Sequence, residues 1–380
     1  MVRKNQAPAA PTRRRGLVVG NYCHDVIIRD DVVVAETLGG ASSFISGLLD
    51  GLEIPADYVS KVGPDFLYAV NHPPITSSTS PTTLFHAHFS SEPRREDRVL
   101  KRVSSCDPIS PSDLPNARFD FGMAVGVAGE ITPQTLEKML DVCDVVFVDL
   151  QALIRVFDPD DGNVKLVGLK ESGFFHLLPR IGFLKASSDE APFLDVEEAR
   201  KWCCVVVTNG KEGCRLYWKD GEVDVAPFLA DQVDPTGAGD SFLGGFVAGL
   251  VHGLAVPDAA LLGNFFGSLT VGHIGLPKFN SRLLQRVKDE VQRRKVQCIG
   301  FHERCNDEFK FTKSLGHEQF LASLGASRLT FPCPIQEYRW DLASSPDDLE
   351  QGIDPRYTTH QKYLLDSVFE EQINSVGTKP

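Results

Sequence analysis

The feature that most constrains the fold is the sequence Asp-Pro-Thr-Gly-Ala-Gly-Asp at residues 234–240, which is followed by an apolar run at residues 241–250. Glycines allow the backbone to turn tightly, and the spacing of the apolar residues is typical of a buried helix. We therefore expect the N–H groups of residues 237–239 to converge at a helix start, where the helix dipole favours a phosphate. Asp240 lies at the same point and could take a proton from an attacking hydroxyl. The motif predicts phosphoryl transfer. The alternative interpretation is a tight strand-to-helix turn without chemistry.

Length and composition indicate an ordinary globular protein. The chain has 380 residues, of which 42% are hydrophobic and 24% charged, so it can bury the core of one large or two smaller α/β domains. Its formal net charge of -12 argues against general nucleic-acid binding, which needs a basic surface. No segment has the apolar length of a transmembrane helix, and the N-terminus lacks the apolar centre of a secretory signal. We therefore expect a cytoplasmic protein that binds neither nucleic acid nor membrane.

The cysteines indicate reduced thiols and not a disulfide framework. There are nine of them, at irregular spacing in a long chain, whereas disulfide frameworks are typical of short secreted chains with an even number. Cys298, His302, Cys305 and Cys333 could imitate a zinc site. Their spacing matches no standard pair of C-x-x-C units, so we interpret them as ordinary thiols and a histidine.

Strands and helices alternate along most of the chain. Strands are predicted at residues 16–20, 119–125, 145–149, 181–185 and 203–208, and helices begin near Phe44, Thr132, Asp195, Asp240, Asp258 and Ser281. Alternation of this kind predicts an α/β fold whose central sheet is mainly parallel and covered by helices on both faces.

Some short strands have no helices between them. They fall within about residues 26–36 and 83–104, and their β-branched and apolar residues are interrupted by charged turns. We interpret them as a small separate β-sheet that covers the active site as a lid, because closure excludes water from phosphoryl transfer. The alternative is a hairpin that decorates the main sheet.

The full motif and the helix after it resemble the second signature of the pfkB carbohydrate kinases, also called the ribokinase family. The resemblance covers roughly residues 15–295 and implies a ribokinase-like kinase domain there, with ATP as phosphoryl donor and Mg²⁺ as cofactor. It implies that Gly237, Ala238 and Gly239 bind phosphate through their amides, and that Asp240 orients and finally deprotonates the acceptor hydroxyl.

The resemblance also implies an acceptor site. Asp25 follows the first strand, where the family has its substrate-holding carboxylate, and it could accept hydrogen bonds from two neighbouring hydroxyls of a polyol. Gly39 and Gly40 match the glycine pair of the first signature, whose backbone lies against the sugar. The asparagine that usually follows is absent, with Ser42, Ser43 and Phe44 in its place. A turn or cap for Asp25, and a plain helix-leading turn for the glycines, are the alternatives.

The same resemblance implies which residues bind the metal ion and the nucleotide. Glu190 matches the family's N-x-x-E string, which helps to hold magnesium largely through water, although Ser187 replaces its asparagine. The loop with Thr208, Gly210 and Gly213 resembles the family's nucleotide loop, and Asn264 is a plausible neighbour of the adenine. Alternatively, Glu190 is a solvated surface glutamate, the loop is a plain glycine-rich turn, and Asn264 is an ordinary polar helix residue.

The two ends of the chain lie outside the resemblance. Residues 1–14 are polar and rich in Pro and Ala, so disorder is expected. Residues 296–380 form an extension of unknown role. Because the periodic α/β pattern stops near Lys295, truncation there is expected to leave a folded and at least partly active kinase. The alternative is that the tail packs over a hydrophobic face through Phe331, Trp340 and Tyr363.

Within the family, the first-strand segment at residues 20–25, the altered glycine loop and the long extension are most similar to the plant kinases of myo-inositol. This resemblance implies phosphorylation of myo-inositol to inositol 3-phosphate, a step that feeds phytate synthesis. The residues themselves indicate only a neutral small-molecule polyol, since the acceptor site shows no Arg cluster for a substrate phosphate. A kinase for ribose, fructose or adenosine is one alternative, and a catalytically silent pfkB-like binding or regulatory protein is the other. The sequence does not indicate the oligomeric state.

Overall fold

The computed structural model of the protein describes residues 14–89, 99–295, 309–313 and 315–330. The expected disordered tail, apart from residue 14, lies outside these ranges, as do the candidate zinc residues Cys298, His302, Cys305 and Cys333. Phe331, Trp340 and Tyr363 also lie outside them. A search of the described helices for one that is both long and apolar enough to cross a membrane finds none.

The central sheet has eight strands in the described part of the chain and is mainly parallel. Side by side, the strands are β16 (Gly221–Val225), β15 (Cys214–Trp218), β14 (Cys204–Thr208), β13 (Phe183–Ser187), β10 (Cys143–Asp149), β9 (Phe119–Ala124), β1 (Gly16–Val19) and β4 (Ala56–Val59). Strand β15 pairs antiparallel with both β14 and β16, because the turns at residues 209–213 and 219–220 are too short for a crossover helix. The predicted mainly parallel sheet is confirmed.

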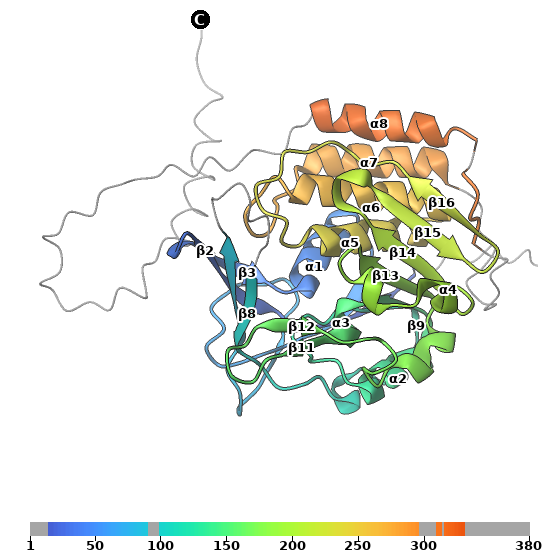
Figure 1. Cartoon of the computed structure of the whole chain (residues 1–380). Helices are drawn as coiled ribbons and strands as arrows, with labels where there is room; N and C mark the ends of the chain where they lie inside the picture. The colour runs from blue at the N-terminus through green and yellow to red at the C-terminus, as the bar shows by residue number, and fades with distance from the viewer. Residues whose placement is uncertain (1–13, 90–98, 296–308, 314, 331–380) are drawn as a thin grey trace, which may run out of the picture. The chain divides into compact units, whose positions relative to one another are not determined.

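Helices cover both faces of this sheet (Figure 1). One face packs on α1 (Ala41–Gly51), α5 (Ala238–Val251), α6 (Val256–Thr270), α7 (Ser281–Arg294) and α8 (His317–Thr330). The other face packs on α2 (Pro133–Val142), α3 (Gln151–Ile154), α4 (Val196–Ala199) and the 3₁₀ turns η2 (Phe175–Arg180) and η3 (Ala191–Phe193). A further 3₁₀ turn, η1 (Pro111–Asp113), contacts α2. Side chains alternate between the two cores along each strand, so Val18 belongs to the first core and its neighbours Leu17 and Val19 to the second.

Local sequence signals set several helix starts as predicted. Thr132 caps α2, since its side chain accepts a hydrogen bond from the N–H of Thr135, and Pro133 is the first helical residue. Asp195 accepts a hydrogen bond from the N–H of Glu198 at the start of α4. This last helix is only one turn long, because the chain turns into β14 directly after it.

A second, smaller sheet is separate from the central one, as predicted for the lid. Its strand order is β3 (Val32–Gly39), β2 (Cys23–Arg29), β7 (Thr83–Phe89) and β8 (Val99–Ser104). Strands β2 and β7 are parallel and the outer pairs are antiparallel. A minor sheet joins β5 (Lys61–Val62) to β6 (Ile75–Thr76).

A hairpin that no sequence pattern predicted lies beside the edge of the small sheet (Figure 1). Its strands are β11 (Arg155–Phe157) and β12 (Val164–Leu166), inserted between β10 and β13. A β-bridge joins Lys101 of β8 to Asn163 in the hairpin. Strands of three residues around an acidic turn are too short for a periodic pattern to identify them.

The packed fold continues past Lys295, so the expected domain boundary there is too early. Phe309 packs edge-on against Phe183 of β13, with ring centroids 4.9 Å apart, and Phe311 stacks on Trp218 at 5.0 Å. Phe320 and Leu324 of α8 are buried in the same core as α6 and α7. These aromatic side chains complete the core across a sequence gap that periodicity could not bridge.

A buried charge network joins the same segment to α6. His317 of α8 lies with its Nδ1 2.6 Å from one carboxylate oxygen of Asp258, and Arg294 of α7 lies 2.9 Å from the other. Asp258 is fully buried. A buried carboxylate is costly unless it is paired, so α6, α7 and α8 depend on one another.

Candidate active site

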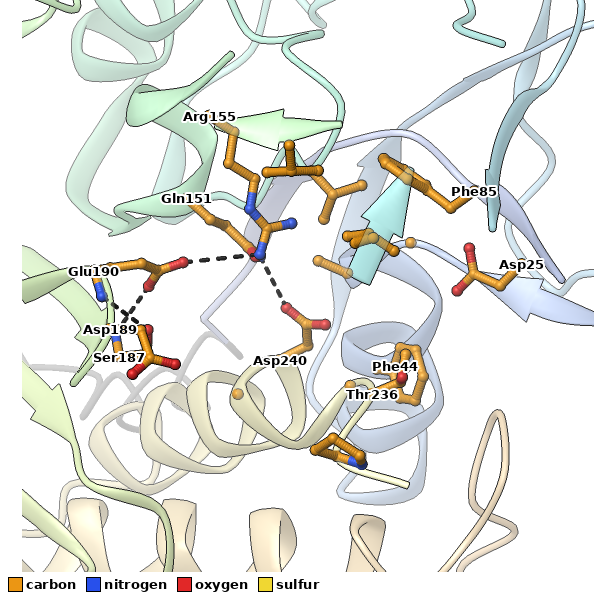
Figure 2. Close-up of a pocket in the computed structure, with 18 of the residues that line it drawn as sticks. Asp25, Phe44, Phe85, Gln151, Arg155, Ser187, Asp189, Glu190, Thr236 and Asp240 are labelled. Carbon is orange, nitrogen blue, oxygen red and sulfur yellow. Dashed lines mark hydrogen bonds and ion pairs between the residues drawn. The ribbon is translucent and has the colours of Figure 1, made fainter. Parts of the chain in front are cut away.

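A cavity of about 830 Å³ lies between the carboxyl ends of the parallel strands and the small sheet (Figure 2), a size within the range of ligand pockets. It is lined by side chains of both sheets, of the β11–β12 hairpin and of the turn before α5. The lining residues are Asp25, Gly40, Ala41, Phe44, Phe85, Val99, Leu100, Val127, Gln151, Arg155, Asn163, Val164, Leu166, Lys185, Ser187, Asp189, Glu190, Pro235, Thr236, Gly237, Gly239 and Asp240.

The start of α5 forms the base of one side of the cavity. Gly237 is its N-cap, with φ at 76°, and a Cβ at this position would lie 2.0 Å from the ring of Phe44. Both the positive φ and the close ring require glycine. The turn leaves the first amides of the helix and Asp240 at the cavity, which is the arrangement that the motif predicted. Ala238 belongs to the same turn but does not line the cavity.

Asp240 sits in a buried polar environment. One of its carboxylate oxygens accepts a hydrogen bond from the side-chain amide of Gln151 at 3.2 Å, as Figure 2 shows. Burial raises the pKa of Asp240, while the positive charges of Lys185 and Arg155 act to lower it. The net result is a pKa above the ordinary aspartate value, which makes the carboxylate a better proton acceptor.

A buried ion pair lies beneath this turn. The ammonium of Lys185 is 3.0 Å from a carboxylate oxygen of Asp149, and both side chains are almost completely buried. Burial acts to lower the pKa of Lys185, but the neighbouring carboxylates outweigh it and the pKa is raised. Lys185 also lines the cavity, so it presents a permanent positive charge there.

Glu190 lies three residues past the end of β13, at the start of η3. Its carboxylate accepts a hydrogen bond from the N–H of Ser187 at 2.8 Å, and its other oxygen is 3.8 Å from the guanidinium of Arg155. Burial acts to raise its pKa, yet the charges of Lys185 and Arg155 prevail and lower it, so the group is ionised. Asp189 lines the cavity beside it. The described residues contain no cluster of three or more metal-ligating side chains.

Asp25 faces the cavity from the small sheet, whereas Asp240 faces it from the start of α5 (Figure 2). It lies on β2 between Thr37 of β3 and Phe85 of β7, and only 9% of its surface is exposed. A Cβ on Gly39 would lie 2.0 Å from its carboxylate, so the glycine backbone is pressed against Asp25. Gly40 lines the cavity, whereas Gly39 supports Asp25 and does not line it.

The serines that replace the family's asparagine hold the glycine loop itself. Ser42 donates a hydrogen bond to the carbonyl of Gly20 at 2.7 Å, and Ser43 donates one to the carbonyl of Gly40 at 2.7 Å. Both side chains are buried. From this loop the cavity therefore receives the ring of Phe44 and not a polar side chain.

The residues predicted to bind the nucleotide are not brought into the cavity. Thr208 ends β14 next to Ser187 of β13 and donates a hydrogen bond to the carbonyl of Ala186. Gly210 is the first residue of the turn η4 (Gly210–Glu212), and Gly213 directly follows it. The amide of Asn264 donates to the carbonyls of Val225, at 3.3 Å, and Ala226, at 2.9 Å. Asn264 thus anchors the end of β16, and its contact with adenine stays a prediction.

Sequence reasoning missed several residues of the cavity. Gln151 lies just past β10 at the start of α3, Arg155 begins β11, and Lys185 belongs to β13. A signal was available for Gln151, because polar residues just past the carboxyl end of a buried parallel strand lie at the ligand edge of the sheet. Phe85 had no such signal, since its place depends on the pairing of β7 with β2.

Comparisons with known proteins agree with this geometry. Residues 181–280 match the pfkB family of carbohydrate kinases. The chain is 64% identical to inositol 3-kinase of Arabidopsis thaliana, over 83% of this chain and 90% of that protein. It is 52% identical to inositol 3-kinase of Oryza sativa subsp. japonica, over 81% of each. A solved pyrophosphate-dependent ribokinase-family kinase, complexed with a pyrophosphate analog and myo-inositol, has a TM-score of 0.58 at 16% identity, covering 69% of this chain and 96% of that one. This last similarity shows the ribokinase-like fold.

Proposed function

The chain belongs to the pfkB family of carbohydrate kinases, and on that premise we propose that it transfers the terminal phosphoryl group of ATP to myo-inositol, giving inositol 3-phosphate. The observation that supports this most directly is that Asp25 and Asp240 face one cavity from different elements. The plant relatives named inositol 3-kinase support the acceptor. The identities of 64% and 52% to these two relatives extend over 83% and 81% of this chain.

The acceptor half of the cavity suits a cyclic polyol. Asp25 can accept hydrogen bonds from two neighbouring hydroxyls, and the amide of Gln151 can donate one. The rings of Phe44 and Phe85 supply apolar walls for the C–H groups of the acceptor ring. The bound acceptor then lies between Asp25, which holds it, and Asp240, which receives the proton of the reacting hydroxyl.

The phosphoryl half supplies charge and orientation. The loose transition state of phosphoryl transfer leaves the protein mainly with positioning and charge stabilisation. The amides at the start of α5 and the ammonium of Lys185 face the same space and would stabilise the transferred group. Asp240 takes the proton late, as the bond between phosphorus and the acceptor oxygen forms.

A Mg²⁺ ion fits the residues beside this half, although its presence remains a prediction. Glu190 is ionised and Asp189 lines the cavity next to it, and magnesium in kinases is held by one or two carboxylates together with substrate phosphates. These two residues would hold it, partly through water. When bound, the ion would neutralise phosphate charge. ATP contacts by Thr208, Gly210 and Gly213, and a cytoplasmic location, also remain predictions.

The test is an ATP-consumption assay with a panel of acceptors. Myo-inositol, its stereoisomers, ribose, fructose and adenosine would be compared with ATP as donor, and pyrophosphate would replace ATP in a parallel series. We expect myo-inositol with ATP to give the highest kcat/KM, by at least about tenfold, because several buried hydroxyl contacts discriminate between acceptors. A preference for a furanose would exclude the inositol assignment but keep the kinase. No turnover with any acceptor would favour the catalytically silent protein.

A further inference from the structure

Three elements that are far apart in the sequence form the walls of the acceptor half. Strand β8 of the small sheet supplies Val99 and Leu100, and the loop after β9 supplies Val127. The β11–β12 hairpin supplies four lining residues, which are Arg155, Asn163, Val164 and Leu166. A cavity built in this way keeps its shape only if the three elements are held together.

Arg102 of β8 contacts both of the other elements. Its backbone N–H donates a hydrogen bond to the carbonyl of Gly162 in the hairpin at 2.8 Å. Its guanidinium lies over the ring of Phe157 in β11, 3.7 Å from the centroid, and donates to the carbonyl of Ala128 in the loop at 2.6 Å. A cation over an aromatic face and a charge-assisted hydrogen bond are both favourable, more so when partly shielded from water.

The loop that receives this hydrogen bond is itself fixed. The buried carboxylate of Glu130 accepts hydrogen bonds from the N–H groups of Asn21 at 2.9 Å and Ala128 at 2.7 Å, and also from Val127. Asn21 belongs to the segment that connects β1 to β2. Because Glu130 ties the loop to this segment, the Ala128 carbonyl is a rigid acceptor for Arg102.

We propose that Arg102 is a positioning residue that fastens the small sheet to the hairpin and the loop, and so keeps the acceptor half of the cavity closed around a polyol. The inference rests on the proposed function for the identity of that acceptor. Arg102 does not line the cavity and acts through the walls that do. Without it, β8 and the hairpin can separate, which weakens acceptor binding and admits water to the transferred phosphoryl group.

The consequence is a change in coupling between ATP consumption and product formation. A closed cavity yields one phosphorylated acceptor for each ADP, whereas water that reaches the phosphoryl group yields ADP and inorganic phosphate without product. The ratio of inositol phosphate to ADP does not depend on the fraction of folded enzyme. It therefore separates a positioning role from a simple loss of stability.

The experiment compares Arg102→Ala with Arg118→Ala. Arg118 is a matched control because its guanidinium also donates to a backbone carbonyl, that of Asp141 at 2.7 Å, but at the surface and away from the cavity. For Arg102→Ala we expect the KM for myo-inositol to rise about tenfold, as for loss of one charge-assisted hydrogen bond. The ratio of product to ADP should fall clearly below that of wild type, while the KM for ATP changes little. Arg118→Ala should match wild type in all three.

Two further variants keep the test decisive. Arg102→Lys retains the charge and one donor but not the planar stack on Phe157, so its coupling should lie between wild type and Arg102→Ala. Phe157→Leu removes the ring beneath the guanidinium and should lower the coupling ratio in the same direction. It serves as the deciding variant if Arg102→Ala does not fold. Wild-type coupling and wild-type KM for myo-inositol in the folded variants would overturn the proposal.

Hydrogen–deuterium exchange gives a readout that needs no activity. Peptides that cover β8 and residues 160–166 should exchange faster in Arg102→Ala than in Arg118→Ala, because loss of the side-chain contacts to Ala128 and Phe157 lets the backbone hydrogen bond from residue 102 to Gly162 open more often. Unchanged exchange would contradict the proposed contact. If wild type fails to phosphorylate myo-inositol, the proposed function is wrong, and the exchange result alone then decides the role of Arg102.

Discussion

The two sides of the cavity are built in different ways. The catalytic side is one contiguous motif at the start of α5, supported by a helix in which residues 241–250 are all buried. The acceptor side is assembled from β2, β7, β8 and the β11–β12 hairpin, and the outer edges of its sheet expose Val33 and Val99 to solvent, by 54% and 45%. A core-supported site holds its geometry rigidly, whereas a small sheet with exposed edges can move. We therefore expect changes on the catalytic side to alter the rate and changes on the acceptor side to alter affinity.

The largest effect should come from truncation after Lys295, which removes the support behind the catalytic side. Phe311 and Phe320 would be lost from the core, where removal of each buried aromatic side chain costs about 3–5 kcal/mol, and the half-buried Phe309 would no longer pack against it. Asp258 would also lose its His317 partner. Because the sum is comparable with the whole stability of an ordinary domain, about 5–15 kcal/mol, we expect no cooperative thermal unfolding and no activity.

The control is a truncation after Gln336, where the compact unit that contains all described residues ends. This variant should unfold cooperatively, with a Tm close to that of the full chain. A soluble and active protein that ends at Lys295 would show instead that the segment at residues 309–330 is dispensable.

Asp240→Asn should have the largest effect on the reaction itself. The substitution keeps the shape of the side chain but removes the proton acceptor, so kcat should fall by about 10²- to 10⁴-fold, the usual contribution of a general base. The Kd for ATP, measured by calorimetry, should stay near the wild-type value. Retention of most of kcat would mean that another group takes the proton.

Asp25→Asn should act mainly on affinity, in line with its place on the acceptor side. Loss of charge-assisted hydrogen bonds worth roughly 1.5 to 3 kcal/mol should raise the KM for the acceptor by about 10- to 150-fold. Steady-state kinetics with varied myo-inositol and saturating ATP would measure this. An unchanged acceptor KM would remove Asp25 from the binding site.

Glu190→Gln should have a smaller effect, confined to the metal requirement. The carboxylate is held by Ser187 and lies near Arg155, so the amide keeps the shape but is a weaker ligand for Mg²⁺. The Mg²⁺ concentration for half-maximal rate should rise, while the acceptor KM stays constant. An equal Mg²⁺ requirement in both proteins would separate Glu190 from the metal.

The smallest expected effect is the change of kcat with pH near neutrality. Burial raises the pKa of Asp240, and a base works only when ionised, so kcat should be constant above this pKa and decline as the pH falls through it. The decline should begin above the ordinary range of aspartate. The same shift means that the folded state holds this proton more tightly than the unfolded chain, so the contribution of Asp240 to stability decreases as pH rises through that window. A kcat that declines only in the ordinary aspartate range would contradict this assignment.

The contrast between the two sides also explains what the sequence could predict. Asp240, Gly237 and the helix after them form one continuous string, so local rules were sufficient to place them. Phe85 and Arg102 reach the acceptor side only through strand pairing between distant segments, which no local pattern records. The segment at residues 309–330 was missed for a related reason. Its aromatic residues pack on Phe183 and Trp218, which are far from them in the sequence, so no local pattern predicts the contact.

The most direct test of the central claim is a crystal structure with myo-inositol and a non-hydrolysable ATP analogue. We expect Asp25 to accept hydrogen bonds from two neighbouring hydroxyls of the ring. We also expect a carboxylate oxygen of Asp240 within about 2.6–3.2 Å of the hydroxyl that faces the terminal phosphate. Myo-inositol bound elsewhere, or bound in this cavity with no hydroxyl in reach of Asp240, would contradict it.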